Sequence, residues 1–136
     1  MGKSGVGIRL KNGKIIFTYS DIMKLPEWPS GPLLEIIEGE LFLVLSPNLN
    51  HQRISRRIAS ILAQYVDQMG LGEIFYAPVD VILSDENVVI PDILFISKER
   101  ANILQAKYIR GAPDFIIEIL SENRDADLKY KKNLYE

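Results

Sequence analysis

The sequence predicts a mixed α/β or α+β fold in which a central sheet is flanked by helices. Three observations lead to this prediction. Residues 54–69 carry apolar side chains at the three- and four-residue spacing of a helix. Residues 33–45 and 73–96 each contain two apolar segments on either side of a short polar turn, which is typical of hairpins. Residues 115–120 (FIIEIL) are apolar on both faces, as in a central strand that is covered on both sides.

The elements that precede the long helix are short and are bounded by turn-forming residues. They are, in chain order, a helix over 21–25, strands over 33–37 and 40–45, and a turn over 46–50. Ser20 can cap the short helix, and Pro26 ends it. Glu38 and Gly39 form the turn of the hairpin, and the polar segment after the hairpin can cap the next helix.

The long helix is the clearest element in the sequence. Its apolar positions are Ile54, Ile58, Ile61, Leu62, Tyr65, Val66 and Met69. Gly70 follows the last of them and ends the helix. The first turns of this helix hold His51 and a cluster of three arginines, Arg53, Arg56 and Arg57.

The second half of the chain is predicted to be built mainly from strands. The expected elements are strands over 73–83, 88–96 and 115–120, a helix around 98–106, and a last helix from about 125 to the end. A polar turn joins the first two of these strands, and a Gly-Ala-Pro turn precedes the third.

The domain organisation follows from length and charge distribution. A chain of 136 residues fits one small domain, which we expect to occupy residues 17–136 because no linker or repeat interrupts them. Residues 1–16 are predicted to be a basic, mobile arm, since they contain four basic residues and no acid. The basic residues are Lys3, Arg9, Lys11 and Lys14. The alternative is a solvated terminal segment without a binding role.

Composition excludes several classes of function. The chain has no cysteine, which excludes disulfides, thiolate catalysis and cysteine-based zinc sites. It has no apolar run of the ~18 residues that a membrane span needs, so no membrane association is expected. The sequence shows no signal peptide, so a cytoplasmic location is expected. A net charge of −2 does not by itself indicate a nucleic-acid-binding protein.

Two acidic residues interrupt apolar strands. Asp92 follows Pro91 within VVIPDILFI, and Glu118 lies within FIIEIL. Because burial of an unpaired carboxylate is unfavourable, each needs a partner. If the two strands are neighbours, a shared Mg²⁺ ion explains both acids, since Mg²⁺ binds one or two carboxylates together with waters and substrate phosphate.

Structural explanations also exist for each acid. Pro91 is expected at a strand edge or a bulge, where Asp92 can bond to the local turn. Glu118 can pair with an arginine. The sequence by itself leaves the choice between these explanations and a cation site open.

The last predicted helix carries a lysine on its apolar face. Lys131 and Asp127 lie in the apolar arc of this helix when residues are placed about 100° apart. The other members of the arc are Leu128, Tyr130, Leu134 and Tyr135. The ammonium group needs an anion, either Asp127 one turn earlier or the carboxylates of the predicted site. Glu40 and His51 are further candidates for that site, although a lone histidine at a helix start is more often structural.

Several segments together resemble a known nuclease family. Four segments are similar to the Uma-two family of restriction-type endonucleases, within the PD-(D/E)xK superfamily. They are VVIPDILFIS, GAPDFIIEILSENRDADLKYKKNLY, LEIIEGELFLVLSPNLNHQRIS and GEIFYAPVDVILSDENVV. The resemblance covers residues 17–136 and implies a restriction-endonuclease-like fold. It also implies that Asp92 and Glu118 are metal ligands and that the carbonyl of Ile119 is a third ligand.

The sequence departs from the superfamily pattern in two places. Leu120 occupies the usual lysine position, and the resemblance assigns that role to Lys131 in a run that also contains Asp127 and Tyr135. In the same resemblance, Glu40 and His51 match the early acidic and histidine positions. Family members continue past the last helix, whereas this sequence stops at residue 136, so a domain cut short at its C-terminus is expected.

The function expected from these residues is hydrolysis of DNA phosphodiester bonds by an endonuclease that uses Mg²⁺, with Mn²⁺ as a possible substitute. Arg53, Arg56 and Arg57 would contact phosphates, which position a protein without reading sequence. A homodimer is expected, because twofold dimers are common and suit cleavage of a duplex. The alternatives are an inactive nuclease-like module that binds DNA or assists assembly, and a glycosidic hydrolase with two carboxylates.

Overall fold

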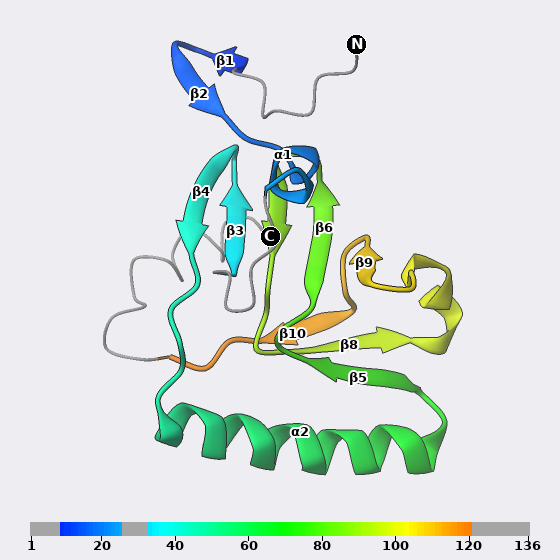
Figure 1. The fold of residues 1–136 in the computed structure, drawn as a ribbon. Coiled ribbons are helices and arrows are strands. Elements are labelled where there is room, and N and C mark those ends of the chain that lie inside the picture. The colour runs from blue at the N-terminus through cyan, green and yellow to red at the C-terminus, as the bar shows by residue number, and fades with distance from the viewer. Residues whose placement is uncertain (1–8, 26–32, 121–136) are drawn as a thin grey trace.

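The computed structural model describes residues 9–25 and 33–120. Its elements, in chain order, are β1 (Arg9–Lys11), β2 (Lys14–Ile16), α1 (Tyr19–Met23), β3 (Leu34–Ile37), β4 (Glu40–Leu43), α2 (Leu49–Met69), β5 (Gly72–Tyr76), β6 (Asp80–Ser84), β7 (Asn87–Val89), β8 (Ile93–Ser97), the 3₁₀ helix η1 (Lys98–Ile103), β9 (Tyr108–Arg110) and β10 (Phe115–Ile117). This mixed α+β architecture is the fold class that the sequence predicts (Figure 1).

The strands form two larger sheets and one hairpin. The first sheet has five strands in the order β4-β3-β7-β6-β9 and is mixed, because β6 and β9 run parallel. The second sheet has three antiparallel strands in the order β10-β8-β5. The β1–β2 hairpin projects at one end of the molecule, and α2 runs along the opposite end beside β5 (Figure 1).

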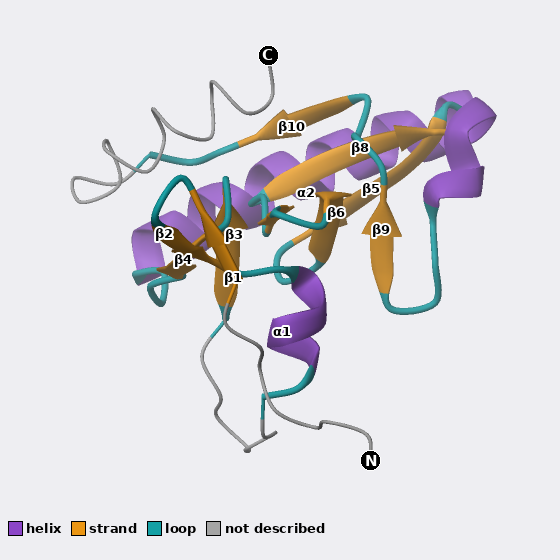
Figure 2. Cartoon of the chain, turned by 90° about the horizontal axis from the view of Figure 1, so that it is seen from above, coloured by secondary structure: helices purple, strands orange, loops and turns teal. Residues whose placement is uncertain are grey.

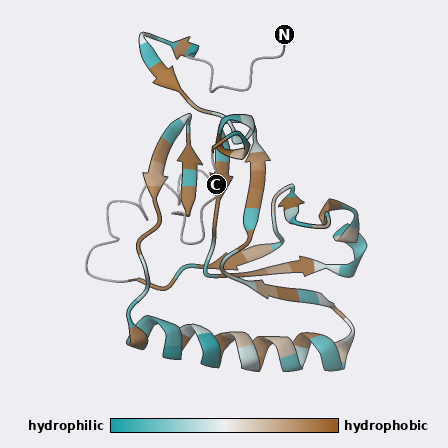
Figure 3. Ribbon diagram, viewed as in Figure 1, coloured by the Kyte–Doolittle hydropathy of each residue, from teal (hydrophilic) through white to brown (hydrophobic). Residues whose placement is uncertain are grey.

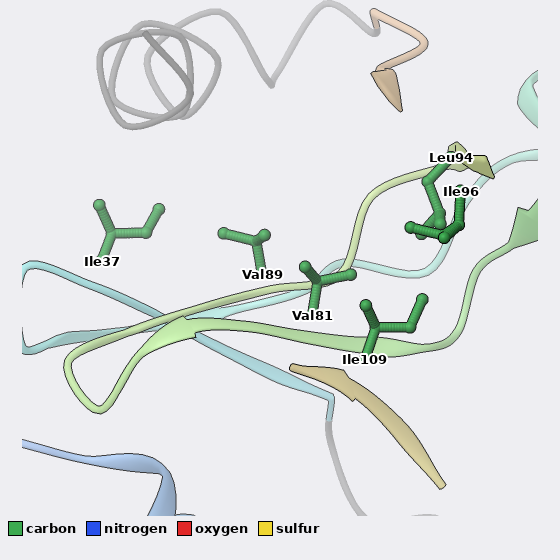
Figure 4. Close-up of a cluster of buried hydrophobic side chains, with 6 residues drawn as sticks. All are labelled: Ile37, Val81, Val89, Leu94, Ile96 and Ile109. Carbon is green, nitrogen blue, oxygen red and sulfur yellow. The ribbon is translucent and has the colours of Figure 1, made fainter. Parts of the chain in front are cut away.

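The main core lies between the two larger sheets. It contains Leu94 and Ile96 from β8 and four side chains from the five-stranded sheet, namely Ile37, Val81, Val89 and Ile109 (Figure 4). A smaller cluster on the other face of the five-stranded sheet packs under α1, and Figure 2 shows α1 and β8 on opposite sides of that sheet. The central strands are accordingly more hydrophobic along their length than α2, where polar and apolar residues alternate (Figure 3).

The long helix has the boundaries and caps that its sequence indicates. The Asn48 side chain accepts a hydrogen bond of 2.8 Å from the backbone N–H of His51 at the start of α2. Gly70 ends the helix in a left-handed conformation with φ 62°, which glycine adopts without steric penalty. His51 and the arginines that follow it therefore lie in the first turns of α2, as predicted.

Two of the predicted strands are each divided into two. The strand predicted over 73–83 separates into β5 and β6 around Ala77 and Pro78, and the strand predicted over 88–96 separates into β7 and β8 around Pro91. A proline has no N–H to donate to a strand ladder, so both segments leave one sheet there and enter the other. The single central sheet expected from the sequence is thus two sheets joined by these crossings.

Several smaller predictions also need correction. Thr18, not Ser20, is the N-cap of α1, and its backbone N–H donates to Asp21 Oδ2 over 2.9 Å. The helix expected around 98–106 is the shorter η1, and β9 was not predicted. Within the described residues β10 is an outer strand rather than a central one, and its Phe115 side chain is 41% exposed. An apolar run therefore did not identify a central strand here.

The N-terminal segment is more structured than a free arm within its described part. Residues 9–16 form the β1–β2 hairpin, and Arg9 pairs with the buried carboxylate of Asp21 in α1. The N–H of Phe17 donates to the carbonyl of Gly39 over 2.8 Å, which ties the end of the hairpin to the β3–β4 turn. Of the helices in the ranges 9–25 and 33–120, none is long and apolar enough to cross a membrane.

Candidate functional site

Asp92 lies where the chain passes from one sheet to the other. The segment Ile90–Pro91–Asp92 joins β7 of the five-stranded sheet to β8 of the three-stranded sheet. Asp92 is 6% exposed, and both residues before it are also buried. The structure therefore places this carboxylate at a buried crossing and not, as the predicted strand over 88–96 implied, in the middle of one strand.

The backbone and the side chain of Asp92 are both held by other elements. Its carbonyl accepts a hydrogen bond of 3.0 Å from the N–H of Ala77. Its Oδ2 accepts one of 2.7 Å from the N–H of Ile119, the residue that follows Glu118. Its Oδ1 lies 3.3 Å from Nε2 of His51. Three segments far apart in sequence thus converge on one residue.

Glu118 directly follows β10, and Asp92 directly precedes β8, the strand with which β10 pairs. β10 and β8 pair antiparallel with Phe115 opposite Phe95 and Ile117 opposite Ile93. When this register is continued by one residue, Glu118 falls opposite Asp92. Opposite residues in an antiparallel pair project to the same face of the sheet, with Cβ atoms about 4.5–5.5 Å apart. The sequence predicts a shared site if the two strands are neighbours, and β8 and β10 are neighbours.

The chemistry of these groups fits a hard divalent cation. Asp92 and Glu118 supply carboxylate oxygens, and Ile119 has a carbonyl in the same segment, which is the kind of donor that Mg²⁺ binds in combination with waters. Within residues 9–25 and 33–120, no three His, Asp or Glu side chains form a metal-binding group by themselves. A cation here would accordingly rely on two carboxylates, a main-chain oxygen and water. Lys131, Asp127 and Tyr135 lie outside the described residues.

His51 reaches Asp92 because the capped end of α2 faces the crossing. The cap from Asn48 orients the first turn, and the His51 side chain is 10% exposed. The sequence indicates only that His51 begins a helix and is a possible accessory group. Its pairing with Asp92 depends on how α2 packs beside β5.

Glu40 is not brought to this site. It begins β4, is exposed, and pairs in register with Ile37 beside the β3–β4 turn. That turn contacts the β6–β7 turn, because the N–H of Gly39 donates to the carbonyl of Glu86 over 3.0 Å. β7 leads away from this point toward Pro91, so Glu40 and Asp92 lie beyond opposite ends of β7.

Glu35 of β3 is a buried carboxylate that was not predicted to be near the site. Glu35 is 6% exposed, and its Oε2 accepts a hydrogen bond of 2.7 Å from the N–H of Ile90. The signal was present in the sequence: Glu35 interrupts the apolar segment LLEII, just as Asp92 and Glu118 interrupt theirs. Because burial of an unpaired carboxylate is unfavourable, Glu35 also needs a partner.

The three arginines predicted to contact phosphates are exposed. Arg53, Arg56 and Arg57 lie in the first half of α2, in the turns that follow His51. Their guanidinium groups are therefore accessible to an anion near the end of the helix that faces Asp92.

Comparison with known proteins identifies the fold and the family. A crystal structure described as "a putative nuclease belonging to DUF820 from Anabaena variabilis ATCC 29413" is similar, with a TM-score of 0.69 and 26% sequence identity. The similarity covers 88% of this chain and 66% of that protein, so this chain spans just under two thirds of its length. No curated protein matches. The profile of the Uma2 family, described as "Putative restriction endonuclease", matches residues 20–136. This chain therefore belongs to the Uma2 family.

Proposed function

We propose that this protein is a metal-dependent endonuclease that hydrolyses DNA phosphodiester bonds. Asp92 and Glu118 bind Mg²⁺, or Mn²⁺ in its place, together with the Ile119 carbonyl, and Lys131 assists the attacking water. The observation that supports this proposal best is the hydrogen bond from the Ile119 N–H to the Asp92 carboxylate. It lies beside the pair Ile117–Ile93, and continuing that register by one residue would set Glu118 opposite Asp92. The description of the Uma2 family as restriction endonucleases supports the same reaction class.

The residues around Asp92 have distinct parts in this mechanism. The Ile119 N–H holds Oδ2 in place, and His51 contacts Oδ1, so the carboxylate is oriented before a ligand arrives. A bound divalent cation would polarise the phosphate and lower the pKa of a coordinated water. Glu118 completes the pair of carboxylates that neutralise such a cation. This arrangement is suited to attack by water on a phosphodiester.

The arginines of α2 would bind the DNA backbone. Replacing Arg53, Arg56 and Arg57 by serine should weaken binding to duplex DNA about equally for all sequences, because phosphate contacts carry no sequence information. The slope of log Kd against log salt should also fall by about 0.9 for each phosphate that the variant no longer neutralises. A matched control replaces three exposed lysines in other parts of the chain, Lys14, Lys24 and Lys107, by serine and removes the same charge. Equal slopes in the two triple variants would argue against a specific role for α2.

Plasmid cleavage tests the proposed activity. Wild type and Asp92→Ala are purified identically and compared with Mg²⁺, with Mn²⁺ and with EDTA. We expect the substitution to reduce cleavage by more than about 100-fold, the upper end of the effect typical of residues that only support a metal ligand. Asp67→Ala, which removes an exposed carboxylate from α2, should cleave like wild type. Equal cleavage by wild type and Asp92→Ala would refute the assignment.

An inactive nuclease-like module is a second candidate function. It is favoured by Leu120, which stands where the superfamily pattern expects a lysine and is 59% exposed. Calorimetric titration separates the two functions. Binding of duplex DNA without heat from Mg²⁺ or Mn²⁺ indicates a module, whereas metal binding that depends on Asp92 indicates the nuclease.

The proposal includes a homodimer in the cytoplasm. Two copies related by a twofold axis would present two sites to the two strands of a duplex. Analytical ultracentrifugation with and without duplex DNA measures the stoichiometry, and cell fractionation measures the location. A monomer in both ultracentrifugation samples would contradict the dimer without affecting the assignment of Asp92.

A further inference from the structure

Glu35 is a carboxylate in an unfavourable place. It lies in β3 between Leu34 and Ile36, and the neighbouring Ile36 and Ile37 are 0% and 4% exposed. Residues alternate in direction along a strand, so Glu35 projects to the same face as Ile37, which belongs to the main core between the sheets. A carboxylate at such a position is kept only if its interactions offset the loss of hydration.

The backbone N–H of Ile90 is one such interaction. Glu35 Oε2 accepts this hydrogen bond over 2.7 Å from a residue 55 positions away in the sequence. A bond from an N–H to an ionised carboxylate is short and about twice as strong as one between neutral groups. Ile90 is itself 4% exposed, so its N–H would be buried without a partner if the carboxylate were removed.

The position of Ile90 makes this bond relevant to Asp92. Ile90 is the first residue after β7, and Pro91 has no N–H, so the Ile90 N–H is the last backbone donor before Asp92. Glu35 holds the start of the crossing, and the bond from Ala77 N–H to the Asp92 carbonyl holds its end. The crossing segment is thus secured on both sides of Pro91.

We propose that Glu35 is a positioning residue for the nuclease site: by binding the Ile90 N–H it sets the Ile90–Pro91–Asp92 crossing so that the Asp92 carboxylate faces Glu118. This inference rests on the proposed function, since it assigns Glu35 to the same site. Ligand groups must be held to about 0.5 Å for a site to work, and a crossing between two sheets has no strand ladder of its own to supply that accuracy. Glu35 acts through the backbone and does not touch the metal.

The effect of substitutions at Glu35 should depend on the position of the side-chain oxygen and not on its charge. Glu35→Gln keeps an oxygen acceptor at the same reach and should retain tight Mg²⁺ binding. Glu35→Asp keeps the charge but withdraws the oxygen by about one carbon–carbon bond. It should therefore raise the Mg²⁺ concentration for half-maximal cleavage by about 10–100-fold, as is typical when a group that orients a metal ligand is altered. Glu35→Met removes the acceptor and should do the same or more.

Glu35→Gln distinguishes a positioning role from others. If Glu35 were itself a metal ligand or acted by its charge, Glu35→Gln would lose Mg²⁺ binding, which would overturn the proposal. If Glu35 served stability alone, the variants would lower the urea midpoint without changing the Mg²⁺ dependence, which would overturn it as well. Glu38→Gln, an exposed change on the same hairpin, is the matched control.

Metal binding to Asp92→Asn, measured by calorimetry in parallel, separates this inference from the function on which it rests. Unchanged Mg²⁺ and Mn²⁺ affinity in Asp92→Asn means that the proposed function is wrong. In a second outcome, Asp92→Asn loses metal affinity while Glu35→Asp and Glu35→Met keep wild-type affinity. The proposed function then stands, and the proposed role of Glu35 is wrong. If Glu35→Met does not fold, the comparison of Glu35→Gln with Glu35→Asp still decides.

Discussion

Nε2 of His51 lies 3.3 Å from Oδ1 of Asp92, and their side chains are 10% and 8% exposed. This pairing joins the capped end of α2 to the crossing between the two sheets. It makes His51 a direct neighbour of the carboxylate on which the proposed activity depends.

Replacing His51 tests the strength of this pairing. His51→Ala removes the imidazole nitrogen that lies 3.3 Å from the buried Asp92 carboxylate, so the free energy of unfolding in EDTA should fall by about 1–3 kcal/mol. His51→Gln offers an amide donor at a similar reach and should recover part of the loss. Urea denaturation measures both, with the exposed neighbour Gln52→Ala as control. Identical midpoints for wild type and His51→Ala would show that the pairing contributes nothing to stability.

Two glycines that follow α2 should respond differently to alanine. A Cβ at Gly72 would lie 2.1 Å from the carbonyl oxygen of Ile96, and Gly72 has φ 151°. A Cβ at Gly70 meets nothing within 4 Å, although its φ is 62°. Backbone strain and overpacking each cost about 1–3 kcal/mol. We therefore expect Gly72→Ala to lower the free energy of unfolding by about 3 kcal/mol or more. Gly70→Ala has no clash and should lower it by about 1–2 kcal/mol, which is the strain of the left-handed conformation.

Thermal or urea unfolding of the two glycine variants measures this difference. A loss at Gly72 no larger than the loss at Gly70 would mean that β5 and β8 do not approach as closely as the register Gly72–Ser97 requires.

The core between the sheets should be sensitive to cavities. Leu94 is 0% exposed and packs with residues from the five-stranded sheet, so Leu94→Ala should cost about 2–5 kcal/mol. Leu43 is 56% exposed in β4, and Leu43→Ala removes the same atoms with an expected change within about 0.5 kcal/mol. Chemical denaturation checks both values. Similar losses for the two variants would contradict the position of the core.

Asp80 should make stability depend on pH. Burial raises the pKa of Asp80, while the hydroxyl of Tyr19, which donates to Asp80 Oδ2 over 3.0 Å, acts in the opposite direction. Burial and the nearby carboxylate together raise the pKa of Tyr19 to about 12. The pKa of Asp80 is therefore higher in the folded state than in the unfolded state. The stability that protonated Asp80 contributes is fully present below the unfolded-state pKa. It is lost as the pH rises through the folded-state pKa.

The neutral variant Asp80→Asn isolates this contribution. At pH 7 it should be more stable than wild type, and the difference should shrink as the pH is lowered toward about 4, near the ordinary pKa of an aspartate. Urea midpoints across this range give the difference directly, with the exposed Asp85→Asn as control. A difference that grows as the pH falls would contradict a raised pKa of Asp80.

Local sequence patterns predicted α2 and the β3–β4 hairpin, because the boundaries of both are set by residues close in the sequence. The period of apolar residues and the glycine after Met69 located α2, because a helix satisfies its backbone within one segment. Glu38 and Gly39 located the β3–β4 hairpin for a similar reason, since the turn residues join adjacent strands. Asp92 and Glu118 could be selected from the apolar segments that they interrupt, because burying an unpaired charge is unfavourable in any fold.

The partners of those acids were decided by tertiary structure. His51 meets Asp92, and Glu35 meets Ile90, across long stretches of chain, while Glu40 lies beyond the other end of β7. The prolines at 78 and 91 were visible in the sequence, but their effect, the division of the strands between two sheets, was not. Strand pairing and register depend on which faces can be buried together, and that is a property of the whole packed chain. The sequence by itself therefore indicated that Asp92 and Glu118 needed partners. Only the folded arrangement of the two sheets and α2 decided what the partners of Asp92 are and that Glu35 is buried as well.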